Sequence, residues 1–251
     1  MNGSNELDGR VAIVTGAGRN IGRAIALELA AGGAAVVVNS RANRAEAESV
    51  ANEIEANGAA ALPVTGDVAD AGAMEKLVAA TVAQFSRIDY LVNNAALRGE
   101  KPIDEMTYAD WRKVLDVTLD GAFHCVKACL PYLRKSGAGA IVNMGGLSAH
   151  AGSKNRVHVV TAKSGLVGLT RALAHDLAGD NVTVNCVAPG LVATARPTDF
   201  TEPQHHAIHH TLSGQRGSPH DVATVVRFLC GPGARYITGQ VIHASGGAFI
   251  A

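Results

Sequence analysis

Short apolar runs alternate with longer amphipathic runs along the whole chain, and this alternation restricts the fold more than any other feature. Runs rich in Val, Ile and Ala predict strands at 11–15, 35–39, 60–65, 90–93, 140–144, 183–188 and 241–244. Apolar residues at helical spacing predict helices at 21–31, 44–57, 71–85, 108–135, 157–178 and 219–230. Strands that alternate with helices form parallel βαβ units, so we expect an α/β fold with a doubly wound parallel sheet.

No linker or internal repeat divides the chain, which favours a single domain over residues 1–251. The 22 basic and 22 acidic residues balance, so nothing indicates nucleic acid or an anionic membrane as a partner. A polar start, and the lack of any apolar run long enough to span a bilayer, favour a cytoplasmic location. The cysteines lack metal-ligand spacing and predict reduced thiols, with Cys125 and Cys129 packed in a helix.

The segment at about 194–217 breaks the alternation, because it is polar and contains several histidines. A loop of this length in a compact domain is typical of a lid over a binding site. Two pairs of histidines spaced four residues apart fit a solvated lid helix, a proton donor that acts after closure, or a metal site. We expect no metal, because no carboxylate stands at the position of the glutamate in an HExxH zinc motif. The histidines are His205, His206, His209 and His210.

A glycine-rich turn joins the first predicted strand to the first predicted helix. Glycines let the backbone approach a pyrophosphate, and the helix N-terminus offers it unpaired N–H groups and a positive dipole. A glycine pattern alone is weak evidence, but a strand before it and a helix after it are the context of a dinucleotide site on a Rossmann fold. The predicted contacts are Gly16, Gly18, Arg19, Asn20, Ile21 and Gly22.

The end of the second predicted strand favours NADP(H) over NAD(H). An acidic residue at this position would bind the 2′-hydroxyl of the adenosine ribose in NAD(H). The chain has Ser40 and Arg41 there instead, with Arg19 in the glycine turn. Two guanidinium groups suit a 2′-phosphate.

These motifs resemble the short-chain dehydrogenase/reductase family, near its ketoacyl-ACP-reductase-like members, over essentially the whole chain. The family's TGxxxGxG turn is present except that Asn20 replaces the middle glycine. Asn93-Asn94-Ala95-Ala96 resembles the family's NNAG segment, and Thr238-Gly239-Gln240 with Gly246-Gly247 resembles its C-terminal signature. The resemblance implies further cofactor contacts from Asp67, Val68, Asn94, Lys163, Pro189, Gly190, Val192 and Thr194.

The resemblance also implies an altered active site. Lys163 occupies the position of the family's catalytic lysine, but the position four residues earlier, where the family has Tyr, is Val159. Gly146 stands at the position of the Ser, and Thr118 at that of the Asn. Ser148 is an alternative for the Ser if the loop 147–156 is shifted. Hydride transfer to a carbonyl requires a placed proton donor, which Val159 cannot provide.

Nearby residues are candidates to replace the lost hydroxyls. His158 neighbours the Tyr position and is alternatively a packing or surface residue. His150 follows Gly146, where the substrate pocket is expected. Arg156 lies about two helical turns before Lys163 and is either an anion-binding group or a solvated charge. Arg98 and Glu100 are expected near the pocket mouth.

Three functions fit this sequence. The first is an NADP(H)-dependent oxidoreductase acting on a small carbonyl, imine or alkene, either without a Tyr proton donor or with a histidine in its place. The second is a lyase, dehydratase or hydrolase on the same fold. The third is a nucleotide-binding subunit without catalysis. The resemblance implies a homotetramer, with a dimer as the alternative.

Overall fold

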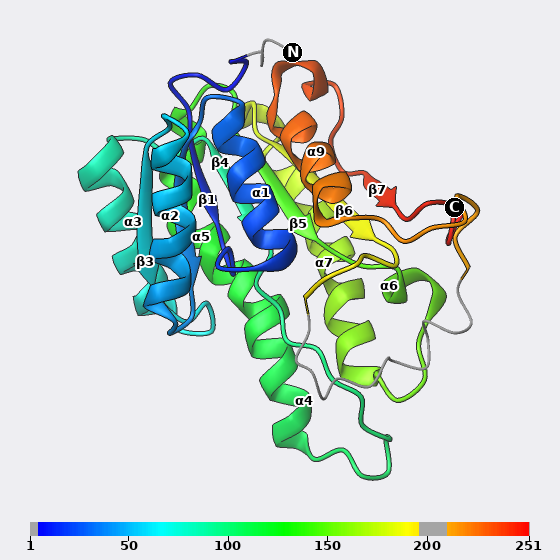
Figure 1. Ribbon diagram of the computed structural model, residues 1–251. Helices are drawn as coiled ribbons and strands as arrows, with labels where there is room; N and C mark the ends of the chain where they lie inside the picture. Colours follow the sequence, from blue (N-terminus) through cyan, green and yellow to red (C-terminus); the bar gives the residue numbers. More distant parts are fainter. Residues whose placement is uncertain (1–4, 196–209, 251) are drawn as a thin grey trace.

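A parallel sheet forms the centre of the molecule in the computed structural model, which describes residues 5–195 and 210–250 (Figure 1). Its strand order is β3-β2-β1-β4-β5-β6-β7, and each pair of neighbours is parallel. The order reverses between β1 and β4, so loops that leave these strands diverge and open a crevice at their carboxyl ends. The strands are β1 Val11–Val14, β2 Ala35–Ser40, β3 Ala61–Thr65, β4 Tyr90–Asn93, β5 Ala140–Met144, β6 Thr183–Pro189 and β7 Val241–Ala244.

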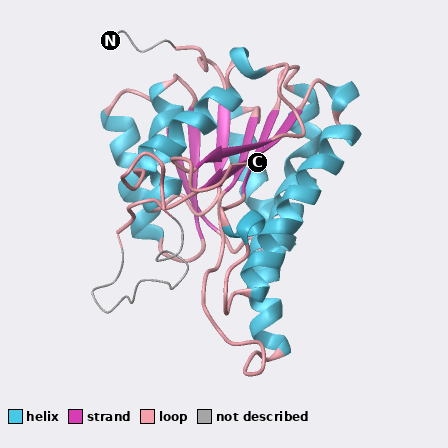
Figure 2. Ribbon diagram, turned by 90° about the vertical axis from the view of Figure 1, so that its right-hand side faces the viewer, coloured by secondary structure: helices cyan, strands magenta, loops and turns pink. Residues whose placement is uncertain are grey.

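Helices cover both faces of the sheet (Figure 2). Buried side chains of α1, α2 and α9 form a core on one face, and those of α3, α5 and α7 form a core on the other. The helices are α1 Asn20–Ala31, α2 Arg44–Ala56, α3 Ala71–Phe85, α4 Tyr108–Leu115, α5 Gly121–Lys135, α6 Ser148–Ala151, α7 Val157–Asp176 and α9 Pro219–Cys230. This arrangement confirms the predicted doubly wound α/β fold.

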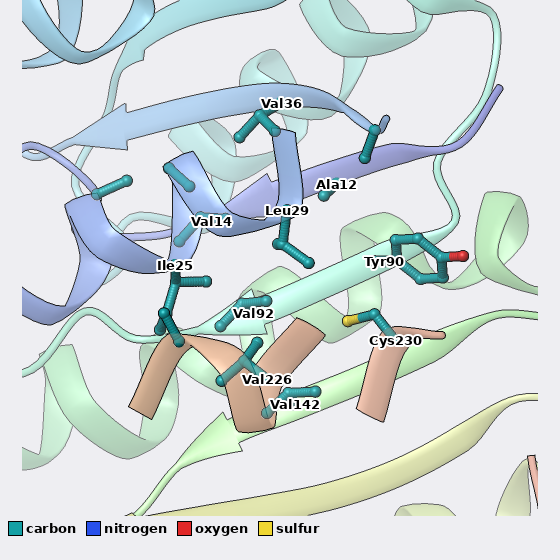
Figure 3. Packing of buried hydrophobic residues seen from close by; sticks show 14 of the residues in the cluster. Ala12, Val14, Ile25, Leu29, Val36, Tyr90, Val92, Val142, Val226 and Cys230 are labelled. Atoms are coloured by element: carbon teal, nitrogen blue, oxygen red, sulfur yellow. The ribbon is translucent and has the colours of Figure 1, made fainter. Parts of the chain in front are cut away.

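The contact between α1 and α9 shows how the apolar spacing builds the core. Ile25 and Leu29 lie one helical turn apart on α1, and Val226 of α9 approaches them from the neighbouring helix (Figure 3). Val14 and Val92, on the central strands, lie beneath the two helices, and all five side chains are fully buried. Burial of such side chains stabilises the fold by about 1.5–3 kcal/mol each.

The predicted strands and helices are all present, with ends that differ by one or two residues, but the helix predicted over 108–135 is not regular. A π-helical turn at Asp116–Asp120 separates α4 from α5. On its exposed side, Arg112 pairs with both Asp116 and Asp120, which fixes the widened turn. Because π turns inside α-helices often occur at functional sites, this turn marks a candidate position in the site.

Two further differences concern the loops. The segment 147–156 contains the short helix α6, which the sequence did not predict. The predicted lid at 194–217 falls largely on residues 196–209, outside the described residues. Its two ends are held together, because the N–H of Gly217 donates to the Leu191 carbonyl (3.0 Å) and that of Ala193 donates to the Gly217 carbonyl (2.8 Å).

A buried carboxylate ties together the amino ends of the central strands. The Asp89 side chain is fully buried and accepts hydrogen bonds from Arg10 (2.9 Å), Arg87 (2.7 and 2.8 Å), Ser136 (2.5 Å) and the Val11 N–H (2.9 Å). Burial alone would raise the pKa of Asp89, but these hydrogen bonds outweigh it and lower the pKa below its usual value. The carboxylate therefore stays ionised and joins β1, β4 and the end of α5.

The four cysteines are free and buried, and Cys125 and Cys129 pack in α5 as predicted. Burial raises the pKa of the Cys125 thiol to about 12, so this residue acts as a small apolar side chain. Among the described residues, no helix has the length and apolar character that crossing a bilayer requires.

Candidate functional site

The glycine turn between β1 and α1 leaves the start of α1 open. Gly16 has φ +60°, and an ideal Cβ on Gly22 would lie 2.2 Å from the Gly16 carbonyl oxygen, so these two positions require glycine. Arg19 precedes α1 without a capping hydrogen bond from its side chain, and the first turn has no acidic residue. The free N–H groups and the helix dipole therefore favour an anion at this point.

Asn20, which departs from the glycine pattern, has a structural role of its own. Its φ is +51°, a left-handed conformation that Asn tolerates better than most residues. Its side-chain amide donates to the Ala195 carbonyl (3.2 Å), and its side-chain oxygen accepts from the Ala195 N–H (2.9 Å). Asn20 therefore links the glycine turn to the segment after β6.

Asn94 holds the turn in place from the end of β4. Its side-chain N–H₂ donates to the carbonyls of Thr15 (2.9 Å) and Gly16 (3.0 Å), while its backbone N–H donates to the Thr15 hydroxyl (3.0 Å). In this structure Asn94 positions the backbone that would surround a nucleotide. Ile21, on the first turn of α1, is buried in the core.

The end of β2 carries the groups predicted to select NADP(H). Arg19 and Arg41 are both exposed, whereas Ser40 is buried and its hydroxyl donates to the Asn43 carbonyl (2.7 Å). The structure adds a carboxylate here: Oε2 of Glu46 lies 3.1 Å from an ideal Cβ on Gly18. Sequence reasoning missed Glu46 because it lies in the first turn of α2, and only the fold brings that turn back to the glycine turn.

Asp67 and Val68 follow β3 at the same edge of the sheet. The Asp67 carboxylate accepts from the Ala69 N–H (3.0 Å), and Val68 is buried against α5, where an ideal Cβ on Gly121 would lie 2.7 Å from its Cγ2. His124 contacts the Val68 carbonyl through Nδ1 (3.2 Å). This packing fixes the end of β3 beside α5.

The end of β6 carries the remaining predicted cofactor contacts. The Pro189 carbonyl accepts from the Leu147 N–H (3.0 Å), and an ideal Cβ on Gly190 would lie 2.7 Å from the Ser245 Cα, so the backbones are close. Val192 is buried and bridges to Gly217, and Thr194 is half-buried. The predicted groups thus follow β1, β2, β3, β4 and β6 at the carboxyl ends of the strands.

Lys163 is a buried titratable group at this edge. Its side chain is 7% exposed, and Nζ donates to the Met144 carbonyl at the end of β5 (2.5 Å). Burial, and to a smaller extent the positive charges of Arg98 and Arg156, lower the pKa of Lys163 to about 7. An ammonium with this pKa exchanges its proton near neutral pH.

The structure places the three positions predicted to have lost a hydroxyl or amide group on α7, in the π turn and after β5. Val159, one helical turn before Lys163, is 2% exposed and belongs to an apolar cluster with Val114 and Leu115 of α4. Thr118, in the π turn, is buried and its hydroxyl accepts from the Leu97 N–H (3.3 Å). An ideal Cβ on Gly146 would meet no atom within 4 Å, so open space lies next to this position. Neither Val159 nor Gly146 can donate a proton from its side chain.

The candidate histidines lie in different surroundings. His158 is 5% exposed, and its Nδ1 makes no hydrogen bond with a side chain or backbone group of the described residues. Its Nε2 lies 3.9 Å from an ideal Cβ on Gly99, in the loop after β4. Burial, and then the charge of Arg156, lower the pKa of His158, so its ring is neutral near pH 7.

His150 is placed differently from what the sequence suggested. Its ring contacts those of His243 (4.6 Å between centroids) and Phe249 (5.4 Å), toward β7 and the C-terminal segment. These rings border a cavity of about 700 Å³ between α7 and β7, also lined by Arg171 and His175. Burial lowers the pKa of His150, and the charge that acts on it is that of Arg171. Among the described residues, the ring contacts of His150 are with His243 and Phe249, whereas Lys163 is bound to the Met144 carbonyl.

The remaining candidates are Ser148 and the four histidines of the predicted lid. Ser148 begins α6 and is half-buried, while His210 is exposed. His205, His206 and His209 lie outside the described residues. Within residues 5–195 and 210–250, no three His, Cys, Asp or Glu side chains are grouped as metal ligands.

The chain is similar to oxidoreductases over nearly its whole length. A family model described as enoyl-(acyl carrier protein) reductase matches residues 16–248. The 3-oxoacyl-[acyl-carrier-protein] reductase of Synechocystis is 40% identical over 244 residues, which are 96% of this chain and 97% of that protein. The corresponding Aquifex aeolicus protein is 38% identical over 248 residues, 97% and 99% of the two chains. A solved dehydrogenase/reductase of Sinorhizobium meliloti has a TM-score of 0.92 at 34% identity, over 100% of this chain and 99% of that one.

Proposed function

The chain belongs to the short-chain dehydrogenase/reductase family of oxidoreductases, and we propose that it transfers hydride between NADP(H) and a small molecule at an active site with an altered proton donor. The observation that carries this proposal is the glycine turn before the open N-terminus of α1, at the crevice where the strand order reverses. A screen of carbonyl, imine and alkene compounds, read out as loss of NADPH absorbance, tests which of them the protein reduces.

The residues at the carboxyl edge fit a dinucleotide. A pyrophosphate fits the close backbone at Gly16 and Gly22, where added Cβ atoms would collide. Arg19 and Arg41 are exposed and available to a 2′-phosphate. Under this proposal Pro189, Gly190, Val192 and Thr194 line the nicotinamide side, and Asp67 and Val68 the adenine side.

A nicotinamide bound at this edge would supply or accept the hydride, while the chain's own groups would orient the substrate and hold or release the proton. The Val159 side chain has no ionisable proton, so the buried Lys163 is the leading group to hold one, at Nζ. A bound cofactor would also place its ribose hydroxyls within reach of Lys163. A pKa of about 7 at Lys163 makes both protonation states accessible near neutral pH. His158 is the second candidate, because its buried ring lies beside the loop after β4. His150 is a weaker candidate, given its contacts with His243 and Phe249.

One observation favours a second function, a cofactor-binding subunit without turnover. Val159 is packed into an apolar cluster rather than exposed in an open pocket. A protein of this kind would bind NADPH tightly but oxidise it with no carbonyl, imine or alkene, and would co-purify with an active relative. Turnover with any such compound excludes this function.

We expect Arg41→Ala to weaken NADPH binding about 10- to 100-fold, because a hydrogen bond between charged groups is lost at the 2′-phosphate. NADH lacks this phosphate, so its affinity should stay within about twofold. Titration calorimetry of the purified protein with each nucleotide measures both constants. Equal losses for NADPH and NADH would show that Arg41 does not contact the phosphate.

Glu46→Gln is a matched control at the same site, because it should change the affinity for NADPH in the opposite direction to Arg41→Ala. The Glu46 carboxylate lies beside the glycine turn, where it repels a 2′-phosphate. Its neutral isostere should strengthen NADPH binding by about threefold or more and leave NADH nearly unchanged. If wild-type protein binds neither nucleotide, the proposed oxidoreductase function is wrong.

We also propose a cytoplasmic homotetramer, with a dimer as the alternative. Large apolar side chains are exposed on α4, α5 and α9: Tyr108 is 76%, Phe123 50% and Phe228 50% exposed. Such side chains on helix surfaces suit burial against other subunits. Light scattering on the purified protein should give a mass near four chains, and a monomer at micromolar concentration would contradict the proposal.

A further inference from the structure

The cavity of about 700 Å³ between α7 and β7 lies where α6 and the C-terminal segment come together (Figure 1). Arg171 and His175 line it from one face of α7, since residues four apart are neighbours on a helix. His243 lines it from β7, and His150 lines it from α6. Arg171 follows Lys163 by two helical turns, about 12 Å along the helix axis, so the cavity is separate from the surroundings of Lys163. Its volume is typical of a small-molecule pocket.

Among the described residues, every ionisable side chain that lines this cavity is basic. These side chains are Arg171 and the three histidines, and the described lining contains no Asp or Glu. Arg171 is exposed, and its side chain makes no hydrogen bond or ion pair with another residue in the described ranges. The charge of Arg171 therefore attracts an anion into the cavity and repels a metal cation. In agreement, no three His, Cys, Asp or Glu side chains of residues 5–195 and 210–250 are grouped as metal ligands.

Two histidine rings of the cavity have a buried nitrogen that the fold does not use. Nε2 of His150 and Nδ1 of His243 are inaccessible to solvent, and neither makes a hydrogen bond with a described residue. The two rings pack against each other (4.6 Å between centroids), and Phe249 contacts both (5.4 and 4.8 Å), which fixes their positions. Burial lowers the pKa of each histidine, so both rings are neutral near pH 7 and each has one N–H. Because a buried polar atom without a partner is costly, an oxygen that accepts from these rings is favoured here.

The lining combines groups for an anion with groups for an apolar body. A guanidinium group binds the paired oxygens of a carboxylate or a phosphate well, and Arg171 supplies one. Phe249 and Val241 add an aromatic and an aliphatic surface to the same cavity. We propose that this cavity is a second binding site, which takes an organic anion with a carboxylate or phosphate group and an aromatic or aliphatic body. Arg171 binds the charged group, and His150 and His243 donate to its oxygens. The site does not depend on the proposed function, because no residue of the glycine turn belongs to it.

The test titrates the full-length protein, saturated with NADPH, with sodium benzoate as the carboxylate and phenyl phosphate as the phosphate, at constant ionic strength. Calorimetry compares wild type with Arg171→Gln and with His243→Phe, which keeps an aromatic ring but removes both nitrogens. Arg44→Gln is the matched control, because it removes an exposed arginine charge from α2, which packs on β3 at the other end of the sheet from β7. We expect at least one anion to bind wild type. Its affinity should be about tenfold weaker or worse in Arg171→Gln, about threefold weaker or worse in His243→Phe, and within about twofold of wild type in the control.

The outcomes separate the possibilities. With the expected losses in the two test variants, tighter binding of benzoate assigns a carboxylate to the ligand, and tighter binding of phenyl phosphate assigns a phosphate. Equal affinities in all four proteins, loss only in Arg44→Gln, or no binding of either anion to wild type would overturn the site. Because Arg171 is exposed, Arg171→Gln decides the matter even if His243→Phe does not fold. Failure of NADPH to bind wild type would instead reject the proposed function, and the same titrations without cofactor would still test this cavity.

Discussion

The double variant Val159→Tyr/Gly146→Ser should reduce a 3-oxoacyl thioester with NADPH about 100-fold faster than the wild-type protein, or more. The added phenol supplies a proton donor one helical turn before Lys163, where the pKa of the tyrosine is lowered by the ammonium. The added hydroxyl at position 146 points into open space, because an ideal Cβ there meets no atom within 4 Å. The assay follows the loss of NADPH absorbance with acetoacetyl-CoA.

The control for this experiment must fill position 159 with a side chain as large as tyrosine. Val159 is 2% exposed in an apolar cluster with Val114 and Leu115, so a larger ring is expected to cost about 1–3 kcal/mol of stability. Val159→Phe/Gly146→Ser has the same bulk but no phenol hydroxyl. If both double variants show the same rate, the missing phenol is not what limits the wild-type protein.

Asp89→Asn should lower the free energy of unfolding by about 3–5 kcal/mol at pH 7, because it leaves charged arginines beside a buried neutral group. The Asp89 side chain is fully buried and accepts from Arg10, Arg87, Ser136 and the Val11 N–H. Urea unfolding at fixed protein concentration measures the difference. Asp180→Asn is the matched control, because its ion pair with Arg134 is exposed and should contribute about 1 kcal/mol at most.

The effect of Asp89 should depend on pH with a definite sign. Its pKa is lower in the folded than in the unfolded state, so its ionisation stabilises the protein fully above the ordinary Asp pKa. This contribution is lost as the pH falls through the folded-state pKa. The gap in stability between wild type and Asp89→Asn should therefore narrow in acid. If the difference in free energy of unfolding stays constant down to pH 3, the charge of the Asp89 carboxylate does not stabilise the folded protein.

The sequence predicted the fold well because the elements are long and strongly patterned. Strands such as 140–144 are mostly apolar and fully buried, and helices such as 71–85 repeat their apolar residues every three or four positions. The π turn at Asp116–Asp120 was not predicted, because the pattern on either side of it is the same helical one. The short helix α6 was missed because four residues are too few to show a period.

The parts of the site that were predicted from sequence are those that short sequence motifs carry. The glycine turn, Asn94 and Lys163 are found at the carboxyl edge, as the motifs implied, although their roles toward a cofactor stay predictions. Glu46 could not be foreseen, because only the return of α2 brings its carboxylate to Gly18. The orientation of His150 toward His243 depends on β7, which lies about ninety residues later in the chain.

The Asp89 network lies at the amino ends of the strands, and the candidate site lies at their carboxyl ends. A parallel strand rises about 3.3 Å per residue, so even the four residues of β1 separate the two ends by on the order of 13 Å. Free-energy changes at sites farther apart than roughly 10 Å usually add without coupling. Substitutions that change ligand affinity at the candidate site can therefore be combined with substitutions that change stability near Asp89, and their effects should add. Affinity and stability of this chain can thus be engineered separately.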